Sequence, residues 1–273
     1  MAKFNYNMIA IGAGSGGLVS TFIASAVKAK VALIEKHEMG GDCLNSGCVP
    51  SKALISAAKH AASARESIDY GITTGTPVTD WQKVKAHIRS AIDTIAPVDS
   101  QERFEGLGVT VIREHAKFSG KDTINSPSAT VKARRIVIAT GSRPYRPADI
   151  NFRHPRIYCS DTILSLSHTP RTLVIFGAGV IGCEYASIFS GLGVKVDLIN
   201  NRDSLLSFLD DEISDALSYH LRKHGVLIRH NEEYESVEGD EAGVVVRLKS
   251  GKKIRADAFL WANGRTGNTD SLG

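Results

Sequence analysis

Residues 7–17 of the chain read Asn-Met-Ile-Ala-Ile-Gly-Ala-Gly-Ser-Gly-Gly, a short apolar run that leads directly into a glycine-rich turn. The same pattern of an apolar run and a glycine-rich turn recurs at residues 172–182, Thr-Leu-Val-Ile-Phe-Gly-Ala-Gly-Val-Ile-Gly. A helix-like stretch follows each turn, at residues 18–27 and 183–190, and a second β-like run follows each helix, at residues 30–34 and 195–199. Two such βαβ openings predict an α/β fold with two Rossmann-like dinucleotide-binding domains.

The glycines of each turn have distinct mechanical roles. The first permits a tight turn, the second lets a pyrophosphate approach the backbone, and the third lets the helix pack closely on the strand. The helix that follows then presents unpaired N–H groups and a positive dipole end to the phosphates. A plain glycine turn is the alternative. The predicted nucleotide-binding glycines are Gly12, Gly14 and Gly17 in the first turn and Gly177, Gly179 and Gly182 in the second.

The two copies differ at the end of their second strand, where a dinucleotide fold places an acidic residue for the adenosine ribose. Glu35 fills this position in the first copy, whereas Asn200 stands there in the second, with Arg202 close behind. A carboxylate repels a 2′-phosphate, and a neutral amide beside an arginine tolerates one. We therefore expect FAD or NAD at the first turn and NADP, or either nicotinamide nucleotide, at the second. Arg202 as a solvated loop charge remains the alternative.

The rest of the chain predicts helices and short strands around these two units. Proline and arginine crowd residues 143–155, which makes this stretch the best candidate for a domain boundary. Short β-like runs between residues 109 and 131 predict a small antiparallel excursion from otherwise parallel sheets. Helices are expected at 51–65, capped by Ser51, at 81–95 and at 210–224. Strands are expected at 226–229, 243–248 and 256–261, and residues 135–141 are expected to form a buried strand that ends in a turn.

Two cysteines, Cys43 and Cys48, lie five positions apart at the entrance to the helix expected from Ser51. This spacing lets them close a disulfide across one turn, and a helix start lowers a thiol pKa and favours the reactive thiolate. A metal site needs two further ligands at suitable spacing, which the sequence does not offer, so no metal is expected. Burial as small apolar side chains is the other alternative. A redox-active pair is the better interpretation, and Cys159 and Cys183 are expected to be structural.

Composition narrows the class of protein further. The chain has 273 residues, 42% of them hydrophobic, and a formal net charge of +4. The sequence has no stripe of basic residues, so nucleic acid is not expected as the main partner. No apolar run is long enough for a membrane helix, and no signal peptide is recognisable at the start of the sequence. Four cysteines are too few for a disulfide scaffold. We expect a cytoplasmic, two-domain protein.

These motifs resemble those of the FAD-dependent pyridine nucleotide–disulfide oxidoreductases, such as dihydrolipoyl dehydrogenase, glutathione reductase and mercuric reductase. The resemblance covers essentially the whole chain. It rests on residues 12–17 with Glu35, the block 41–52, Ala-Thr-Gly-Ser at 139–142, residues 177–184 and Ala-Asn-Gly-Arg at 262–265. It implies an FAD-binding domain at residues 1–147, without its closing strands, and an NAD(P)-binding domain at residues 148–273.

The resemblance also implies roles for single residues. Cys48 is the sulfur on the flavin side and Cys43 the one that exchanges with substrate. Lys52 lies near the flavin N5 edge and pairs with Glu184. Gly41, Thr140 and Gly141 join the FAD-binding residues, and Gly264 borders the nicotinamide nucleotide. In this family NAD(P)H passes a hydride to FAD, and the reduced flavin opens the disulfide.

Two departures leave the activity open. Residues from about 134 onward are most similar to the soluble pyridine nucleotide transhydrogenases, which exchange hydride between NADPH and NAD through FAD without a cysteine pair. The family also continues beyond the point that matches Gly273, with a second flavin-contacting segment and a dimerisation domain, so the homodimer it implies belongs to full-length members. The predicted function is a disulfide reductase; the alternatives are a transhydrogenase and a nucleotide-binding fragment without turnover.

Overall fold

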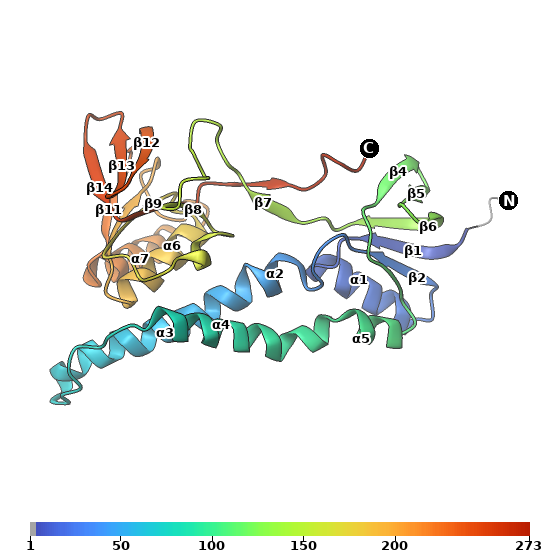
Figure 1. Ribbon diagram of the computed structural model, residues 1–273, viewed down its shortest axis with the longest axis horizontal. Helices are drawn as coiled ribbons and strands as arrows, with labels where there is room; N and C mark the ends of the chain where they lie inside the picture. The colour runs from blue at the N-terminus through green and yellow to red at the C-terminus, as the bar shows by residue number, and fades with distance from the viewer. Residues whose placement is uncertain (1–3) are drawn as a thin grey trace. The chain divides into compact units, whose positions relative to one another are not determined.

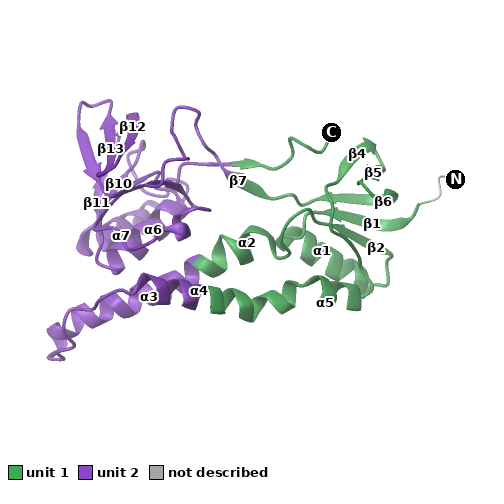
Figure 2. Cartoon of the chain, viewed as in Figure 1, with its two compact units in different colours: residues 1–50, 89–143, 266–273 green, residues 51–88, 144–265 purple. Residues whose placement is uncertain are grey.

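The computed structural model describes residues 4–273, which form two compact units (Figures 1 and 2). Unit 1 takes the residues up to 50 together with 89–143 and 266–273, and unit 2 takes 51–88 and 144–265. The chain therefore crosses between the units four times. The predicted class, α/β with two Rossmann-like units and mostly parallel sheets, is confirmed. The cut expected between residues 147 and 148 lies near the third crossing, and the assignment of FAD and NAD(P) to its two sides stays a prediction.

Unit 1 is built on a six-stranded sheet with the order β3-β2-β1-β6-β5-β4. Its strands β1 (Tyr6–Ile11), β2 (Val31–Ile34) and β3 (Thr110–Ile112) are parallel to one another, and β1 is also parallel to β6 (Thr130–Ile138). The strands β4 (Lys117–Gly120) and β5 (Thr123–Asn125) form the antiparallel edge. Every residue of β2 is at most 1% exposed, as expected for a parallel strand that is covered on both faces.

Short helices complete unit 1. Helix α1 (Ser15–Ala26) joins β1 to β2 and packs against both strands. Helix α2 (Gly41–Asn45) follows β2, and α5 (Gln101–Gly106) precedes β3 after the 3-10 turn η2 (Ala96–Asp99). The Ser100 hydroxyl caps α5 by accepting a hydrogen bond from the Arg103 N–H.

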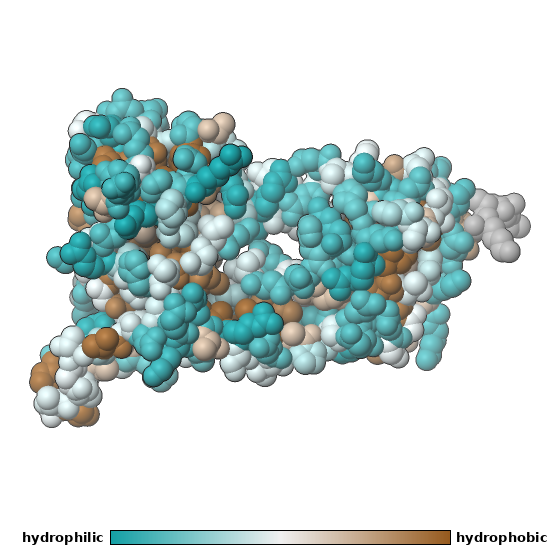
Figure 3. All heavy atoms as spheres, viewed as in Figure 1, coloured by the Kyte–Doolittle hydropathy of each residue, from teal (hydrophilic) through white to brown (hydrophobic). Residues whose placement is uncertain are grey.

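Two longer helices, α3 (Cys48–Glu66) and α4 (Trp81–Ile95), have residues in both units, and Figure 2 shows each of them change colour. Asp80 begins α4 by accepting hydrogen bonds from two N–H groups of its first turn. Between the two helices lie the 3-10 turn η1 (Ser67–Tyr70) and a loop, where Ile68, Ile72 and Val78 are exposed. Apolar atoms are visible at this tip in Figure 3.

Unit 2 contains a five-stranded parallel sheet with the order β11-β10-β9-β15-β8. Helix α6 (Val180–Gly191) joins β9 to β10, and α7 (Asp211–Lys223) joins β10 to β11. The strands of this sheet are β8 (Ile157–Cys159), β9 (Thr172–Phe176), β10 (Lys195–Ile199), β11 (Leu227–Arg229) and β15 (Ala258–Trp261).

Among the residues described, none forms a helix that is long and apolar enough to cross a membrane.

A second, antiparallel sheet in unit 2 is formed by β12 (Tyr234–Asp240), β13 (Gly243–Leu248) and β14 (Lys253–Ala256). An aromatic core joins it to the parallel sheet: Phe176 and Trp261 stack with ring centroids 5.0 Å apart, and Tyr234 meets both rings edge-on. The 3-10 turn η3 (Ile163–Ser165) lies between β8 and β9. The strands β7 (Ser142–Pro144) and β16 (Arg265–Gly267) pair with each other, and each contains a point where the chain passes from one unit to the other.

Several sequence-based boundaries need correction. Helix α3 begins at Cys48, so Ser51 is a buried residue of the helix and not its cap. Pro50 fits the first turn because its missing N–H has no intrahelical partner there. The stretch expected as one strand at 256–261 is broken at Asp257, whose carboxylate accepts hydrogen bonds from the Arg171 and Thr172 N–H groups. Finally, β3 belongs to the parallel part of its sheet, and the antiparallel excursion is β4, β5 and the start of β6.

Candidate functional site

The glycine turn of unit 1 is closed by backbone contacts that only glycine allows. Gly12 has φ +105°, and a Cβ there would lie 2.2 Å from the Ala139 carbonyl oxygen. A Cβ on Gly17 would lie 1.7 Å from the Gly12 carbonyl oxygen. The first and third glycines are therefore required by the contact of the β1–α1 turn with the end of β6 and by the contact of α1 with that turn.

The second glycine, Gly14, is the amino-terminal cap of α1, and no side chain caps the helix or places an acidic group in its first turn. The N–H groups of this turn therefore lack side-chain acceptors and suit an anion. Gly41 faces Gly14: a Cβ on Gly41 would lie 2.6 Å from the Gly14 Cα. Backbone alone thus lines this part of a pocket, which Thr140 and Gly141 also line. A pyrophosphate fits such a cradle.

Glu35 ends β2 at the same place. Its Oε2 accepts a hydrogen bond from the Ala13 N–H at 2.7 Å, and its Oε1 accepts one from the His37 N–H at 2.7 Å. Each carboxylate oxygen keeps a further lone pair, so Glu35 retains acceptor capacity for ribose hydroxyls. The carboxylate is thus fixed beside the glycine turn, as the sequence predicted, and its contact with a nucleotide stays a prediction.

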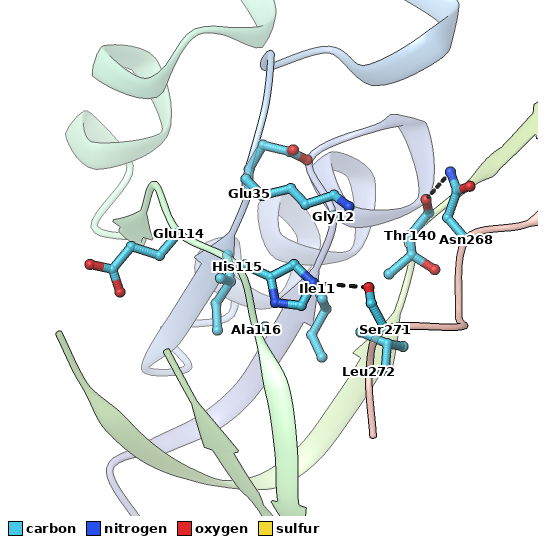
Figure 4. Close-up of a pocket in the computed structure, with 12 residues that line it drawn as sticks. Ile11, Gly12, Glu35, Glu114, His115, Ala116, Thr140, Asn268, Ser271 and Leu272 are labelled. Carbon is cyan, nitrogen blue, oxygen red and sulfur yellow. Dashed lines mark hydrogen bonds between the residues drawn. The ribbon is translucent and has the colours of Figure 1, made fainter. Parts of the chain in front are cut away.

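A second, smaller pocket adjoins the first (Figure 4). The two share Gly12, Glu35, Lys36, Thr140 and Asn268, so they form one elongated trough within unit 1. Its shape suits a dinucleotide with its pyrophosphate at the glycine turn. The smaller pocket is lined by Ile11, Gly12, Ile34, Glu35, Lys36, Glu114, His115, Ala116, Thr140, Asn268, Ser271 and Leu272.

Of this lining, the sequence predicted only Gly12, Glu35 and Thr140 as site residues. The residues that it missed include His115, Ala116, Asn268, Ser271 and Leu272. A signal existed for the first two: they follow β3, a parallel neighbour of β2, and the carboxyl ends of parallel strands meet at one edge of a sheet. Asn268, Ser271 and Leu272 carried no such signal, because they reach unit 1 from a distant part of the chain.

Cys43 lies in α2 and Cys48 begins α3, with the two thiols within hydrogen-bonding reach. Gly47 permits this tight link, since a Cβ there would lie 2.9 Å from the Asp42 carbonyl oxygen. Cys43 is half-buried and Cys48 is exposed. Burial and, after it, the Cys48 thiol raise the pKa of Cys43, while the Ser15 hydroxyl opposes the rise. The raised pKa of Cys43 runs against the expectation that a helix start favours its thiolate, and burial is the largest cause.

Lys52 and Glu184 lie on α3 and α6, and their side chains form the ion pair that the family resemblance implies. The Lys52 side chain is 59% exposed, so the pair adds little to stability. Their roles beside a flavin stay predictions. Cys159 and Cys183 are buried in unit 2, as expected of structural residues, and burial raises the pKa of Cys183 to about 12.

The glycine turn of unit 2 repeats the geometry of the first. Gly177 has φ +108°, and a Cβ there would lie 2.7 Å from the Ala262 carbonyl oxygen. A Cβ on Gly182 would lie 1.8 Å from the Gly177 carbonyl oxygen, while one on Gly179 would meet no atom within 4 Å. Gly179 caps α6, again without a side-chain cap or an acidic first turn. Gly264, with φ +96°, follows β15 as Gly141 follows β6. An anion fits here for the same reasons.

Asn200 ends β10 but turns toward its own loop. It is 3% exposed, and its Nδ2 donates to the Ser204 carbonyl at 2.7 Å. Arg202 lies on the exposed part of this loop, and its Nη1 donates to the Ser207 hydroxyl at 2.7 Å. Both residues are near the second turn as predicted, and their contacts with a nucleotide stay predictions.

Two sheets with parallel central strands, each with a glycine turn that opens an uncapped helix, define a protein with two units of the dinucleotide-binding fold, one of which carries a pair of neighbouring thiols. The chain belongs to the pyridine nucleotide-disulphide oxidoreductase family, whose model matches residues 6–273. By its description this family consists of oxidoreductases, and FAD and NAD(P) are the cofactors that it implies. The cradle at Gly14 and Gly41 fits the diphosphate of FAD.

The relatives divide between two activities. The chain is 54% identical to the soluble pyridine nucleotide transhydrogenases of Chromohalobacter salexigens and Azotobacter vinelandii, which it matches over its whole length while spanning 60% of theirs. Its structure is similar to that of the HOCl-induced flavoprotein disulfide reductase RclA from Escherichia coli, with a TM-score of 0.83 and 27% identity, over 98% of this chain and 58% of that one.

Proposed function

We propose that the protein binds FAD in unit 1 and NAD(P)H in unit 2, and that it passes reducing equivalents on to a disulfide of Cys43 and Cys48. The observation that carries the proposal is the contact between the two thiols, directly beside the trough of unit 1. Asp42, Asn45 and Ser46 of the same segment line that trough. A sulfur pair in this position suits a relay between a bound flavin and a disulfide substrate.

The chain's own residues supply binding, orientation and the sulfur chemistry. The uncapped first turn of α1 and the Gly14–Gly41 cradle bind the diphosphate, and Glu35 orients the ribose. FAD, when bound, supplies the two-electron carrier between a nicotinamide and the sulfurs. Cys43 and Cys48 take up two electrons and two protons when their disulfide opens. The raised pKa of Cys43 keeps its thiol protonated at neutral pH, so exchange with substrate needs a base to remove this proton.

Transhydrogenation between NADPH and NAD is the second candidate, because the 54% identical relatives bear that name. Both candidates share the entry of electrons from a nicotinamide in unit 2 and differ in the route by which the electrons leave. We also propose a location in the cytoplasm and a homodimer for the longer protein to which the relatives correspond.

Anaerobic reduction of the purified chain with NADPH or NADH separates the candidates. A disulfide reductase yields a long-wavelength thiolate–flavin charge-transfer band and two new titratable thiols. Direct passage to fully reduced flavin without new thiols contradicts the relay. Cys48→Ser should abolish disulfide reduction and leave transhydrogenation intact, with Cys159→Ser as a control for loss of a thiol elsewhere. A chain that stays colourless after added FAD contradicts both activities.

A further inference from the structure

A groove of unit 2 lies between the helices α3, α6 and α7, and it shares no residue with the cofactor sites proposed above. Small residues let α3 and α6 approach each other closely here: a Cβ added to Gly191 would lie 3.0 Å from the Ala58 Cβ. The Arg65 guanidinium joins the same two helices by donating to the Gly191 carbonyl oxygen. These contacts hold α3 against the carboxyl-terminal end of α6.

A contact between α3 and α7 closes another side of the groove. His224 Nε2 lies 3.2 Å from Glu66 Oε1, and His224 Nδ1 donates to the His220 carbonyl oxygen at 2.8 Å. The His220 and His224 rings lie side by side, with centroids 4.3 Å apart and planes tilted by 41°. The Glu66 carboxylate thus already has a partner, and two imidazole rings line the α7 side.

The floor of the groove is apolar. Ala58, Ile188 and Leu221 line it, and each is at most 3% exposed. Ile55 and Ala62 of α3 extend this surface. Ligand pockets combine such an apolar surface with a few polar groups that fix the orientation of the ligand. A flat aromatic body suits this floor and the neighbouring imidazole rings.

The polar groups at the rim are mainly donors with free capacity. Lys59 and Ser63 lie four residues apart on α3 and therefore share one face of the helix. In the part of the chain that the structure describes, neither side chain has a hydrogen-bond or ion-pair partner. Burial, and after it the His224 imidazole, lower the pKa of His220, so this ring is mainly neutral at pH 7 and keeps one N–H. Because Glu66 is engaged by His224, the Lys59 ammonium is left as the unpaired charge of the groove.

We propose that this groove binds a small carboxylic acid with an aromatic body. The carboxylate accepts hydrogen bonds from the Lys59 ammonium and the Ser63 hydroxyl, and the ring lies on the apolar floor beside His220. An aromatic acid matches the groove in both respects, because its charge meets an unpaired cation and its ring covers apolar side chains. The inference goes beyond the proposed electron transfer and does not depend on it.

Isothermal titration calorimetry of the full chain with naphthoate tests the inference. We expect a single site with a dissociation constant below about 1 mM. Naphthamide, which lacks the charge, should bind about fivefold more weakly, and acetate, which lacks the ring, should give no detectable heat. Equal binding of the acid and the amide would contradict the role of Lys59.

Two substitutions locate the probe. Lys59→Met keeps the length of the side chain and removes its charge, so it should weaken naphthoate about fivefold and leave naphthamide unchanged. Ala62→Leu should weaken both ligands more than about tenfold, because the larger side chain fills the groove. Lys253→Met, which removes an exposed charge of β14 in the same unit, is the matched control and should bind naphthoate as wild type does.

Thermal unfolding checks that each variant is folded. If Ala62→Leu does not fold, Lys59→Met and the comparison of acid with amide still decide the question, since Lys59 is exposed. Wild type that gives no heat with naphthoate overturns the inference, and so does binding that both variants retain. Displacement of naphthoate by FAD or NADPH, alike in wild type and in both variants, would place the probe in a cofactor site and also overturn it. None of these outcomes alters the thiolate–flavin band, which tests the proposed function separately.

Discussion

Units 1 and 2 use the same glycine turn to bring a helix close to a strand. In each, the first glycine has φ near +105° and contacts an alanine carbonyl at the end of a neighbouring strand, and the third glycine contacts the carbonyl of the first. Ala139 serves this purpose in unit 1 and Ala262 in unit 2, each followed two residues later by a glycine with positive φ. Backbone geometry, and not the ligand, therefore fixes the first and third glycines.

The units differ in what surrounds this shared turn. Glu35 is held by two backbone N–H groups beside the turn of unit 1, whereas Asn200 bonds with its own loop in unit 2. Neighbouring thiols follow β2 in unit 1, while unit 2 keeps its cysteines buried. The turn therefore supplies a common cradle, and the residues just after the second strand give each unit its chemistry.

The largest effect should follow from placing a methyl group at the third glycine. We expect Gly17→Ala to abolish FAD retention and Gly182→Ala to abolish NAD(P)H binding, each with a loss of about 4 kcal/mol or more in unfolding free energy, because the new Cβ would overlap a backbone oxygen. Thermal unfolding and ligand titration check both variants. Equal damage to both ligands from one variant would show that the units do not fold independently.

The second glycine should separate binding from folding. Cβ atoms at Gly14 and Gly179 have room, so Gly14→Ala and Gly179→Ala should fold with unfolding temperatures close to that of wild type. The added methyl groups stand where a diphosphate approaches, so affinity for the dinucleotide of that unit should fall about tenfold to a hundredfold. Unchanged affinity in either variant would move the phosphate away from that helix.

Arg202 is the candidate contact of unit 2 with the ribose end of the nucleotide. If its guanidinium meets a 2′-phosphate, Arg202→Ala should raise the dissociation constant for NADPH about tenfold and leave that for NADH unchanged. Arg222→Ala, which removes an exposed arginine of α7, is the control. Equal constants for wild type and Arg202→Ala would assign Arg202 to the solvated loop.

The smallest effect concerns the thiols. Burial and the Cys48 thiol raise the pKa of Cys43, so its alkylation by iodoacetamide should still accelerate with pH above pH 9, because the thiolate is the reactive form. Cys48→Ala removes one of the two causes and should speed alkylation of Cys43 a few-fold at pH 8. Cys183, with its pKa of about 12, should react only after unfolding. Peptide mass spectrometry follows each site, and a Cys43 rate that levels off below pH 8 would contradict the raised pKa.

The sequence predicted both glycine turns, their helices and Glu35 because each depends on neighbours within one βαβ unit. It placed the start of α3 three residues late, since Ser51 has the chemistry of a cap while the tight link at Gly47 starts the helix earlier. It missed β12 and β14 because most of their residues are exposed and polar, so neither strand shows a clear apolar run. It missed His115 and Ser271 because that contact joins residues far apart in the chain.

The core of unit 1 joins Ile9, near one end of the chain, to Leu272, near the other. During synthesis on a ribosome, the first βαβ unit emerges long before Leu272, so the apolar side chains that pack with Leu272 lack this neighbour while residues 144–265 of unit 2 are translated. Unit 2 has no such wait once Arg265 has left the exit tunnel. In a nascent chain stalled between these points, unit 2 should be folded and unit 1 incompletely folded, and a chaperone should bind mainly to unit 1.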